Sequence, residues 1–434
     1  MPSRKGRPPR IVYAAGFGNV IGTFERWLAG RDDPTEVAIT YSEQFFDICA
    51  ALNAEALVVA SRLACYPRGT LSARGIRVVH RTNRWAYKRG LSYHFWQFWE
   101  GMRTLVTVIA FRADVAVVSD GTCPWFMLRL LPRLGIAVIP SIHCIFYTGD
   151  SPRGGRVNRV LRALDRPFWQ RSAACALSVS RDITRQLATL SGGMHPPVLQ
   201  FLPVYRESSF EGTSAPPPPG TSFRVLFAGR IERAKGIFTL LEVAKRLRAE
   251  GRPEIEFELC GAGSALEALR GQVRAAGVAG TFRLHGHCDR LTMLEMFGKS
   301  HVVIVPTIAD AGEGLAKIVV EGVLASRPVI ASSVCPAIEY VREAVVVVPA
   351  DDVNGYHDAI LSLRDDAHLY ESKRKACQQV QRQFYEYSRG WGAALAQALA
   401  LVSGLDVHVP QSNLTQSSAM ARKSDGCISP SLEA

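Results

Sequence analysis

The sequence predicts an α/β protein with two domains, each built as a parallel sheet covered by helices. Short aliphatic runs alternate with helical stretches, a proline-rich segment divides them into two series, and 434 residues are enough for two or three domains. Hydrophobic residues make up 47% of the chain and charged residues 21%, a composition typical of globular proteins. A disordered chain, a fibrous repeat and a small disulfide scaffold are thereby excluded.

The runs that we expect to form strands are four to six residues long and rich in Val, Ile, Leu and Ala. They are residues 10–15, 56–60, 76–80, 115–120, 136–141 and 176–180, then 223–228, 255–260, 281–285, 302–306, 328–331 and 344–348. Helices are expected between them, for example over residues 239–248, 265–275, 290–299 and 315–325. This alternation favours parallel sheets, since parallel neighbours need a crossover connection.

Residues 206–220 separate the two series and include the run Pro216–Pro219 with glycine and serine nearby. Because such a run continues neither a strand nor a helix, we expect a hinge linker there. The expected domains are therefore residues 1–205 and 221–384. Beyond about residue 404 the sequence is polar and aperiodic, so we expect a disordered tail over 404–434.

The net positive charge of the chain comes entirely from its N-terminal half. Residues 1–210 contain 27 basic and 14 acidic residues, whereas the remainder contains 24 and 25. The ten cysteines form no Cys-x-x-Cys pair and mostly stand among apolar residues. We therefore expect reduced, buried cysteines in a cytoplasmic protein, without a metal cluster.

The N-terminus superficially imitates a signal peptide, because basic residues 1–10 precede an apolar run over 11–24. That run contains Gly16, Gly18 and Asn19, which fit a first strand that ends in a glycine-rich turn better. No apolar run reaches about 18 residues, so no transmembrane helix is expected.

The first candidate site follows the strand expected over 223–228. Arg230 stands at the carboxyl end of that strand, and Lys235 stands where the next helix begins. Ligands of open α/β sheets bind at the carboxyl ends of strands, and two cations beside a helix N-terminus suit a diphosphate. The alternative is a pair of ordinary surface cations.

Two further motifs point to the same edge of the sheet. Gly261-Ala262-Gly263 follows the strand over 255–260 and allows a tight turn or a close backbone approach, although a plain strand-to-helix turn has the same pattern. Glu313 is expected in the loop after 302–306, with Gly314 opening a helix that carries Glu321. The dipole of that helix would favour an anion near Gly314 and Leu315. Two surface glutamates are the alternative.

Together these features resemble the donor-binding domain of retaining group 1 glycosyltransferases with the GT-B fold. The resemblance covers roughly residues 223–360, with the motifs in family order. They are Gly229-Arg230, Lys235-Gly236, Gly261-Ala262-Gly263, Gly286, Glu313 with Glu321, Arg327-Pro328-Val329-Ile330-Ala331, and Glu339. Ala316 departs from the pattern, since the family frequently has glycine or proline there. The implied architecture is two Rossmann-like domains that face each other, with residues 385–403 forming a last helix that returns to the N-terminal domain.

The resemblance implies a role for each matching residue. Arg230 and Lys235 would neutralise the nucleotide diphosphate as the leaving group, which is electrostatic catalysis. Glu313 would hold hydroxyls of the transferred sugar, and Glu321 would accept hydrogen bonds from the donor ribose. His143 matches a histidine that approaches the transferred sugar. The remaining implied donor-binding residues are Gly16, Gly18, Gly229, Gly261, Gly263, Gly286, Gly314 and Leu315.

Family chemistry completes the expectation. Members of the family normally retain the anomeric configuration without an obvious protein nucleophile. The leaving phosphate assists attack on the same face of the sugar. The family generally needs no metal, so no cofactor is expected beyond the nucleotide-sugar donor substrate. The loop Gly16-Phe17-Gly18-Asn19 would close over the site from the N-terminal domain.

The basic N-terminal half contains a cationic and aromatic segment. Arg81, Arg84, Lys88 and Arg89 lead into a stretch from Tyr93 to Trp99. Such a segment suits an anionic membrane surface. The alternative is an amphipathic helix whose apolar stripe packs on the sheet, and the two can coexist. That stripe would contain Leu91, Phe95, Phe98 and Met102. Nucleic acid is not favoured, because no recognised module occurs.

The sequence thus predicts a hexosyl-type glycosyltransferase that transfers a sugar from a nucleotide-diphosphate-sugar to a polysaccharide, a lipid-linked glycan or another acceptor. We expect it in the cytoplasm, with peripheral attachment to the cytoplasmic face of the membrane as a further expectation. Two alternatives stay open at this point: a nucleotide-sugar epimerase of the same fold, and a scaffold that binds the donor without turnover.

Overall fold

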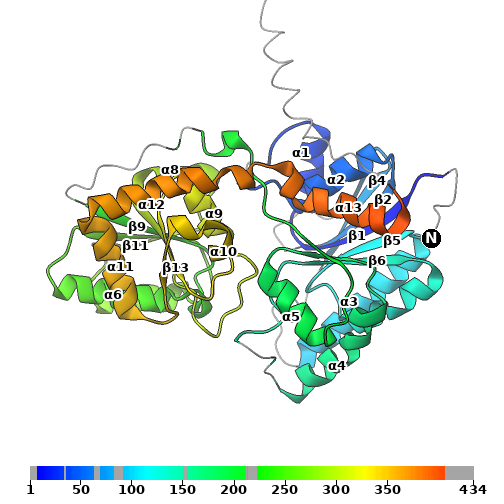
Figure 1. Cartoon of the computed structure of the whole chain (residues 1–434), viewed down its shortest axis with the longest axis horizontal. Coiled ribbons are helices and arrows are strands. Elements are labelled where there is room, and N and C mark those ends of the chain that lie inside the picture. Colours follow the sequence, from blue (N-terminus) through cyan, green and yellow to red (C-terminus); the bar gives the residue numbers. More distant parts are fainter. Residues whose placement is uncertain are drawn as a thin grey trace, which may run out of the picture.

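The computed structural model describes residues 7–33, 36–62, 69–82, 91–149, 152, 155–211, 213 and 222–405. It shows two α/β domains, each with its own sheet (Figure 1). Residues 406–434 of the expected tail and residues 214–220 of the expected linker lie outside the described residues, as do Arg84, Lys88 and Arg89.

The N-terminal domain contains an eight-stranded sheet in the order β3-β4-β2-β1-β5-β6-β7-β8. All neighbours are parallel except β3, which runs antiparallel to β4. The strands are β1 (Arg10–Phe17), β2 (Glu55–Arg62), β3 (Gly69–Ala73), β4 (Ile76–Thr82), β5 (Val115–Ser119), β6 (Ala137–Ile142), β7 (Ala176–Ser178) and β8 (Val198–Gln200). The sequence did not predict β3 and β8, because β3 is a mostly exposed edge strand and β8 is three residues long.

Helices cover both faces of this sheet (Figure 1), with α1 and α2 on one side and α3, α4 and α5 on the other. Their bounds are α1 (Val20–Leu28), α2 (Tyr41–Ala51), α3 (Leu91–Ala110), the 3₁₀ segment η1 (Trp125–Leu134), α4 (Arg156–Arg171) and α5 (Arg181–Ser191). Side-chain caps fix three of the helix starts: Asn19 accepts from the amide of Gly22, Thr40 from that of Glu43 and Ser180 from that of Ile183.

The expected orientation of α3 is wrong. Phe95, Phe98 and Met102 do not pack on the sheet but are 69%, 49% and 38% exposed, whereas Trp96 and Val108 are buried. Aromatic and aliphatic residues occupy both arcs of this helix, so its periodicity alone does not decide which arc faces the sheet.

The C-terminal domain contains a six-stranded parallel sheet in the order β11-β10-β9-β12-β13-β14. Its strands are β9 (Phe223–Ala228), β10 (Ile255–Cys260), β11 (Phe282–Gly286), β12 (Val302–Val305), β13 (Val329–Ser332) and β14 (Val345–Val348). Its helices are α6 (Ile237–Ala249), α7 (Leu266–Ala275), α8 (Arg290–Lys299), α9 (Lys317–Leu324), α10 (Ile338–Val341), α11 (Val353–Asp365) and α12 (Ala367–Val380). The central strands are buried on both faces, which explains their continuous runs of Val and Ile.

The last helix, α13 (Trp391–Ser403), lies beside α2 of the N-terminal domain (Figure 1). Trp391 is fully buried, and its indole nitrogen donates to Ser141 Oγ at 2.8 Å. The amide of Gly392 donates to the side chain of Gln44 at 2.8 Å. The chain therefore crosses between the domains twice, once near residue 210 and once after α12.

Strand order reverses at one point in each sheet. The reversal lies between β1 and β5 in the N-terminal sheet and between β9 and β12 in the C-terminal sheet. In open α/β sheets the crevice beyond the carboxyl ends of such strands is the usual binding place. The loops that follow β5, β9 and β12 are therefore the first places to look for a site.

Three remaining observations concern the described residues only. Each of the eight cysteines there is free, and only Cys144 is exposed. No helix in that part of the chain is long and apolar enough to cross a membrane. Nor does any group of three or more His, Cys, Asp and Glu side chains in these ranges lie close enough to hold a metal ion.

Candidate functional site

Lys235 and Glu313 form an ion pair beyond the carboxyl ends of β9 and β12, where strand order reverses. The same carboxylate oxygen, Oε1 of Glu313, accepts a hydrogen bond from Thr307 Oγ1 at 2.9 Å. Glu313 is only 8% exposed, so the lysine and the hydroxyl supply the polar partners that a buried carboxylate needs. Sequence analysis singled out both charges but missed Thr307, although Thr307 follows β12 at its carboxyl end.

Arg230 is the more accessible cation of this edge. Its side chain is 69% exposed and pairs with Glu232 at 3.0 Å. A cavity of about 350 Å³ opens beside it, and its lining comes from the ends of β9, β10 and β11. The lining residues are Ala228, Gly229, Arg230, Cys260, Gly261, Ala262, His287, Cys288 and Met293. A mostly apolar cavity next to an exposed guanidinium can hold a flat ring and an attached anion.

The glycines of this edge allow two loops to touch. A β-carbon on Gly261 would lie 1.8 Å from the carbonyl oxygen of Gly229, and one on Gly263 would lie 2.4 Å from that of Ile231. Both glycines are therefore needed for the contact between the loops after β9 and β10. Gly286 has a φ of 74° at the end of β11, and its carbonyl accepts from the amide of Gly261 at 2.6 Å.

The helix that carries Glu321 begins later than expected. α9 starts at Lys317, and Gly314 and Leu315 belong to the preceding loop. Ala316 adopts a left-handed conformation with a φ of 67°, which turns the chain into the helix. The helix start predicted at Gly314 is therefore wrong by three residues, and the amides of Gly314 and Leu315 do not belong to the first turn of α9. Leu315 is 4% exposed, and its carbonyl accepts from the amide of Ala337 at 3.1 Å.

The Glu313 loop touches the N-terminal domain. A β-carbon built on Gly314 would lie 1.7 Å from the carbonyl oxygen of His143, directly after β6. A β-carbon on Gly312 would lie 3.0 Å from the side chain of Ile145. The structure thus brings predicted residues from both domains together.

His143 is held by three aromatic or hydroxyl neighbours. Its Nε2 lies 2.9 Å from Ser141 Oγ, and its ring lies 4.6 Å from that of Tyr41 and 5.5 Å from that of Phe201. Burial, assisted by the charge of Lys317, lowers the pKa of His143 to about 3. Ser141 already accepts from Trp391, so its hydroxyl proton can go to Nε2 and leave Nδ1 as the N–H donor of a neutral imidazole.

Glu321 of α9 is half-buried where this helix meets Tyr205 of the N-terminal domain. It accepts a hydrogen bond from the Tyr205 hydroxyl at 3.3 Å, and burial raises its pKa. The neighbouring charges come from both domains. The carboxylates of Glu321 and Glu36, with Tyr41, outweigh burial and raise the pKa of Lys317. Lys317 Nζ also lies 5.4 Å from the centre of the Tyr41 ring.

The expected loop over residues 16–19 is shorter in the structure. β1 continues to Phe17, so Gly16 belongs to the strand, where the register shifts and its φ is 77°. Asn19 is the N-cap of α1, which leaves Gly18 as the connection. The segment predicted to close over the site is therefore a strand end joined almost directly to a helix start.

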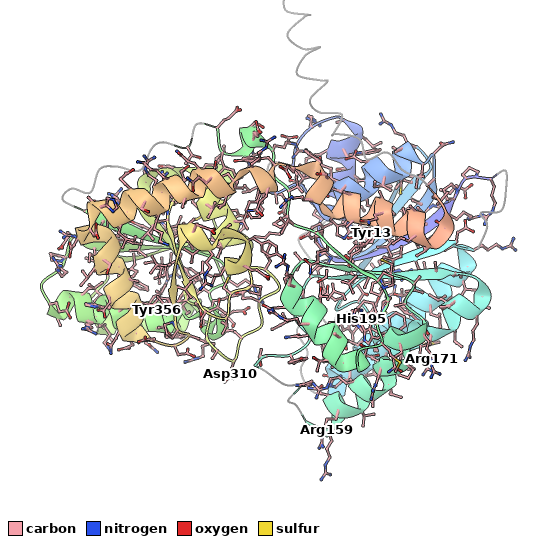
Figure 2. All side chains as sticks on the ribbon, viewed as in Figure 1. Tyr13, Arg159, Arg171, His195, Asp310 and Tyr356 are labelled. Carbon is pink, nitrogen blue, oxygen red and sulfur yellow. The ribbon has the colours of Figure 1, made fainter. Side chains whose placement is uncertain are left out.

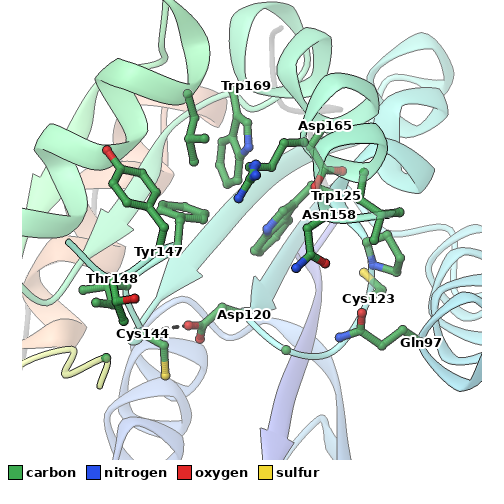
Figure 3. Close-up of a pocket in the computed structure, with 18 of the residues that line it drawn as sticks. Gln97, Asp120, Cys123, Trp125, Cys144, Tyr147, Thr148, Asn158, Asp165 and Trp169 are labelled. Atoms are coloured by element: carbon green, nitrogen blue, oxygen red, sulfur yellow. Dashed lines mark hydrogen bonds between the residues drawn. The ribbon is translucent and has the colours of Figure 1, made fainter. Parts of the chain in front are cut away.

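A larger cavity of about 550 Å³ lies in the N-terminal domain, next to Cys144 (Figure 3). Asp120, the first residue after β5, accepts a hydrogen bond from the amide of Cys144 at 2.7 Å. Burial raises the pKa of Asp120 to about 6. Trp125 and Trp169 form part of the walls, and Gly312 of the C-terminal domain closes one side. Sequence analysis missed Asp120, because we assigned it to the strand itself.

Comparison with known proteins agrees with this geometry. Residues 213–384 match the family described as "Glycosyl transferases group 1". The chain is 28% identical over 152 residues to 2-deoxystreptamine N-acetyl-D-glucosaminyltransferase from Niallia circulans. This aligned segment covers 35% of this chain and 38% of that protein. It is 27% identical over 260 residues to alpha-D-kanosaminyltransferase from Streptomyces kanamyceticus, covering 57% of this chain and 66% of that protein. The chain thus spans less than two thirds of either relative.

The whole chain shares its fold with solved structures. Sucrose-phosphate synthase from Thermosynechococcus elongatus matches with a TM-score of 0.64 at 15% identity, over 96% of this chain and 98% of that one. The Anabaena protein HepE in complex with UDP matches with a TM-score of 0.62 at 13% identity, over 91% and 98%. The architecture is therefore GT-B, with two Rossmann-like domains. The family match lies mostly within the C-terminal domain of this fold.

Proposed function

We propose that this protein is a glycosyltransferase that takes a sugar from a nucleotide-diphosphate-sugar and retains the configuration of the anomeric carbon. The observation that carries this proposal is the arrangement of Arg230, Lys235 and Glu313 at the strand-order reversal of the C-terminal sheet, opposite His143. The named relatives and the UDP-bound structure with the same fold support a donor of this class.

The donor would lie along the carboxyl edge of the C-terminal sheet. The cavity beside Arg230 would accept the base and ribose, with the diphosphate between Arg230 and Lys235. Glu321 would hold ribose hydroxyls, since a half-buried carboxylate that has one tyrosine partner keeps further lone pairs available. Two cations at the departing diphosphate would stabilise the negative charge that develops there, and such preorganised charges contribute several kcal/mol.

The transferred sugar would lie between Glu313 and His143. Glu313 keeps one carboxylate oxygen, Oε2, beyond the two partners that Oε1 has, so it can accept a bond from a sugar hydroxyl. The neutral imidazole of His143 would offer a hydrogen-bond donor without adding a charge. The acceptor would approach from the larger cavity of the N-terminal domain, which Asp120 lines and which we call the Asp120 cavity. A polysaccharide, a lipid-linked glycan and a small glycoside all remain within the proposed acceptor class.

Calorimetric titration with UDP, GDP and ADP and their common sugar conjugates tests the donor site. We expect one nucleotide to bind to the wild-type protein and its affinity to fall in Glu321→Ala, because the ribose loses its carboxylate partner. Exchange of Glu295 for alanine is the matched control, since Glu295 is an exposed glutamate that pairs only with Lys299 on α8. Absence of binding across the whole panel would contradict the proposal and favour a scaffold.

A transfer assay distinguishes the proposed transferase from a nucleotide-sugar epimerase. Incubation of the donor that binds with glycan acceptors is expected to release nucleoside diphosphate only when an acceptor is present. The proton coupling constant at the new anomeric centre reports whether configuration is retained. An epimerase would instead convert the donor into a nucleotide-sugar of altered configuration, without an acceptor and without net release of nucleotide.

A further inference from the structure

The solvent-facing side of α3 is mostly apolar. From Ser92 to the end of the helix, every residue that is exposed is apolar, and Arg103 is partly exposed beside them. Six of them form what we call the α3 stripe, namely Phe95, Phe98, Trp99, Met102, Val106 and Ile109, with exposed fractions from 38% to 69%. At 100° per residue these six positions fall within an arc of about 100°, so they share one face. A contiguous exposed apolar face of this kind usually marks an interaction surface.

The elements next to α3 add more apolar side chains and a surplus of arginine. η1 packs against both α3 and α4, and all three lie on the same side of the N-terminal sheet (Figure 1). Leu130 and Leu134 of η1 and Val157, Val160 and Leu164 of α4 are 42% to 58% exposed. The same two elements carry the exposed arginines that we call the arginine set: Arg129, Arg133, Arg156, Arg159 and Arg166. Figure 2 shows Arg159 pointing away from the protein at the tip of α4.

Negative charge is missing from the same surface. Within the described parts of α3, η1 and α4 the acidic residues are Glu100, which is buried and paired with Arg103, and Asp165, which is half-buried. Asp165 accepts a hydrogen bond from the amide of Phe126 at 2.7 Å and lines the Asp120 cavity. The exposed charge of these three elements is therefore uniformly positive.

We propose that this face, formed by the α3 stripe and the arginine set, docks on an anionic lipid bilayer. Exposed Phe, Trp, Met and Ile side chains on one helix face suit insertion at headgroup depth, and surrounding arginines attract anionic headgroups. A second copy of this chain fits less well, because two arginine sets would then face each other. Nucleic acid also fits less well, because a stripe without polar side chains would be buried against phosphates.

The Asp120 cavity lies between these same elements. Its lining includes Tyr93 and Gln97 of α3, Trp125 of η1 and Asn158 and Arg162 of α4 (Figure 3). The positions on α3 and α4 are within one helical turn of Phe95, Phe98, Val157 and Val160 of the docking face. An acceptor carried by a lipid could therefore reach the cavity from the bilayer. This last consequence rests on the proposed transfer reaction, whereas docking itself does not.

Flotation of the full chain with vesicles tests the docking. We expect binding to phosphatidylcholine vesicles in which one lipid in three is phosphatidylglycerol, and weak binding to pure phosphatidylcholine. The paired change Phe98→Glu with Trp99→Glu should lower the partition coefficient by tenfold or more, and so should Arg156→Glu with Arg159→Glu, at roughly fivefold per arginine near the surface. Leu291→Glu and Arg274→Glu, on exposed positions of the C-terminal domain, are the matched controls and should leave it unchanged.

Each result decides for or against the proposal. Circular dichroism and thermal unfolding of the same samples show whether the variants are folded, so that a lower partition coefficient reports a change of the surface. Wild-type protein that fails to float with anionic vesicles overturns the docking, as does equal loss in the control variants. A dimer in light scattering that dissociates in the Phe98 and Trp99 variant also overturns it, since the occupant would then be a second copy. Failure of nucleotide binding in the wild type contradicts only the transferase proposal.

Discussion

Gly314 lies against the backbone of His143, and this contact joins the two domains at the centre of the candidate site. No side chain fits there, since a β-carbon on Gly314 would lie 1.7 Å from the carbonyl oxygen of His143. The requirement arises from the approach between the domains, because no positive φ demands a glycine at this position. The Glu313 loop can therefore reach the N-terminal domain only with glycine at its tip.

Gly314→Ala should push the domains apart by roughly 2 Å to restore normal contact distances. We expect transfer activity to fall on the order of 100-fold, because small misplacements of reacting groups have effects of this size. Nucleotide binding, which depends on the C-terminal domain, should change much less. Steady-state kinetics with calorimetry checks this. Gly271→Ala, at an open position of α7, is the control, and equal activity of both variants would contradict the contact.

Ala316 holds a left-handed conformation that glycine adopts without cost. Ala316→Gly should therefore raise the free energy of unfolding by about 0.5–1 kcal/mol. The strain that is relieved in the folded state exceeds the entropy that glycine adds to the unfolded chain. Chemical denaturation measures the change. Ala268→Gly in helix α7 is the matched control and should lower the free energy of unfolding by about 1 kcal/mol. Destabilisation by both exchanges would refute the strain at Ala316.

The Lys235–Glu313 pair predicts opposite effects on binding and transfer. Glu313→Gln removes the charge that partly neutralises Lys235, so a nucleoside diphosphate should bind several-fold more tightly. Transfer should nevertheless slow by about 100-fold, because the contact to the sugar is lost. Calorimetry and initial rates provide the two readouts. Glu242→Gln, in the exposed pair with Lys245, should change neither quantity.

Much of the fold could be predicted from the sequence, because the central strands are buried on both faces and therefore appear as continuous aliphatic runs. β9 and β10 agree with the expected ranges residue for residue. The elements that were missed lack this signal, since β3 is a mostly exposed edge strand. In α3 the period of the helix was recognisable, but which arc faces the sheet depends on packing against η1, and the sequence holds no trace of that.

The candidate site was only partly predictable for a related reason. Motif order identified Lys235 and Glu313, but their ion pair joins residues that are 78 positions apart. Thr307 and Asp120 carry no motif and become significant only because the sheet topology places their strand ends at the order reversals. The helix α9 begins later than predicted because Ala316 takes a conformation that its residue type disfavours.

Arg327 is a buried cation whose partners are main-chain carbonyls. It is 1% exposed, and its guanidinium donates to the carbonyl oxygens of Phe297 and Ser300 at 2.8 Å and to that of Ala325 at 2.6 Å. Arg327→Met leaves these acceptors unpaired, so the free energy of unfolding should fall by about 3 kcal/mol or more. Denaturant titration measures this. Arg246→Met, in an exposed pair with Glu250, should cost less than about 0.5 kcal/mol, and similar losses for both would disprove the role of Arg327.

The lowered pKa of His143 makes the stability of the protein depend on pH. Its pKa in the folded protein is about 3, well below the 6.5 of a free histidine, so the unfolded chain binds one more proton at intermediate pH. The contribution of His143 to stability is therefore present above pH 6.5 and is lost as pH falls toward 3, at about 1 kcal/mol per pH unit. Unfolding free energies of wild type and His143→Gln, measured between pH 7 and pH 5, should diverge with this sign. Parallel curves would mean that the folded and unfolded chains bind this proton equally, which would contradict the lowered pKa of His143.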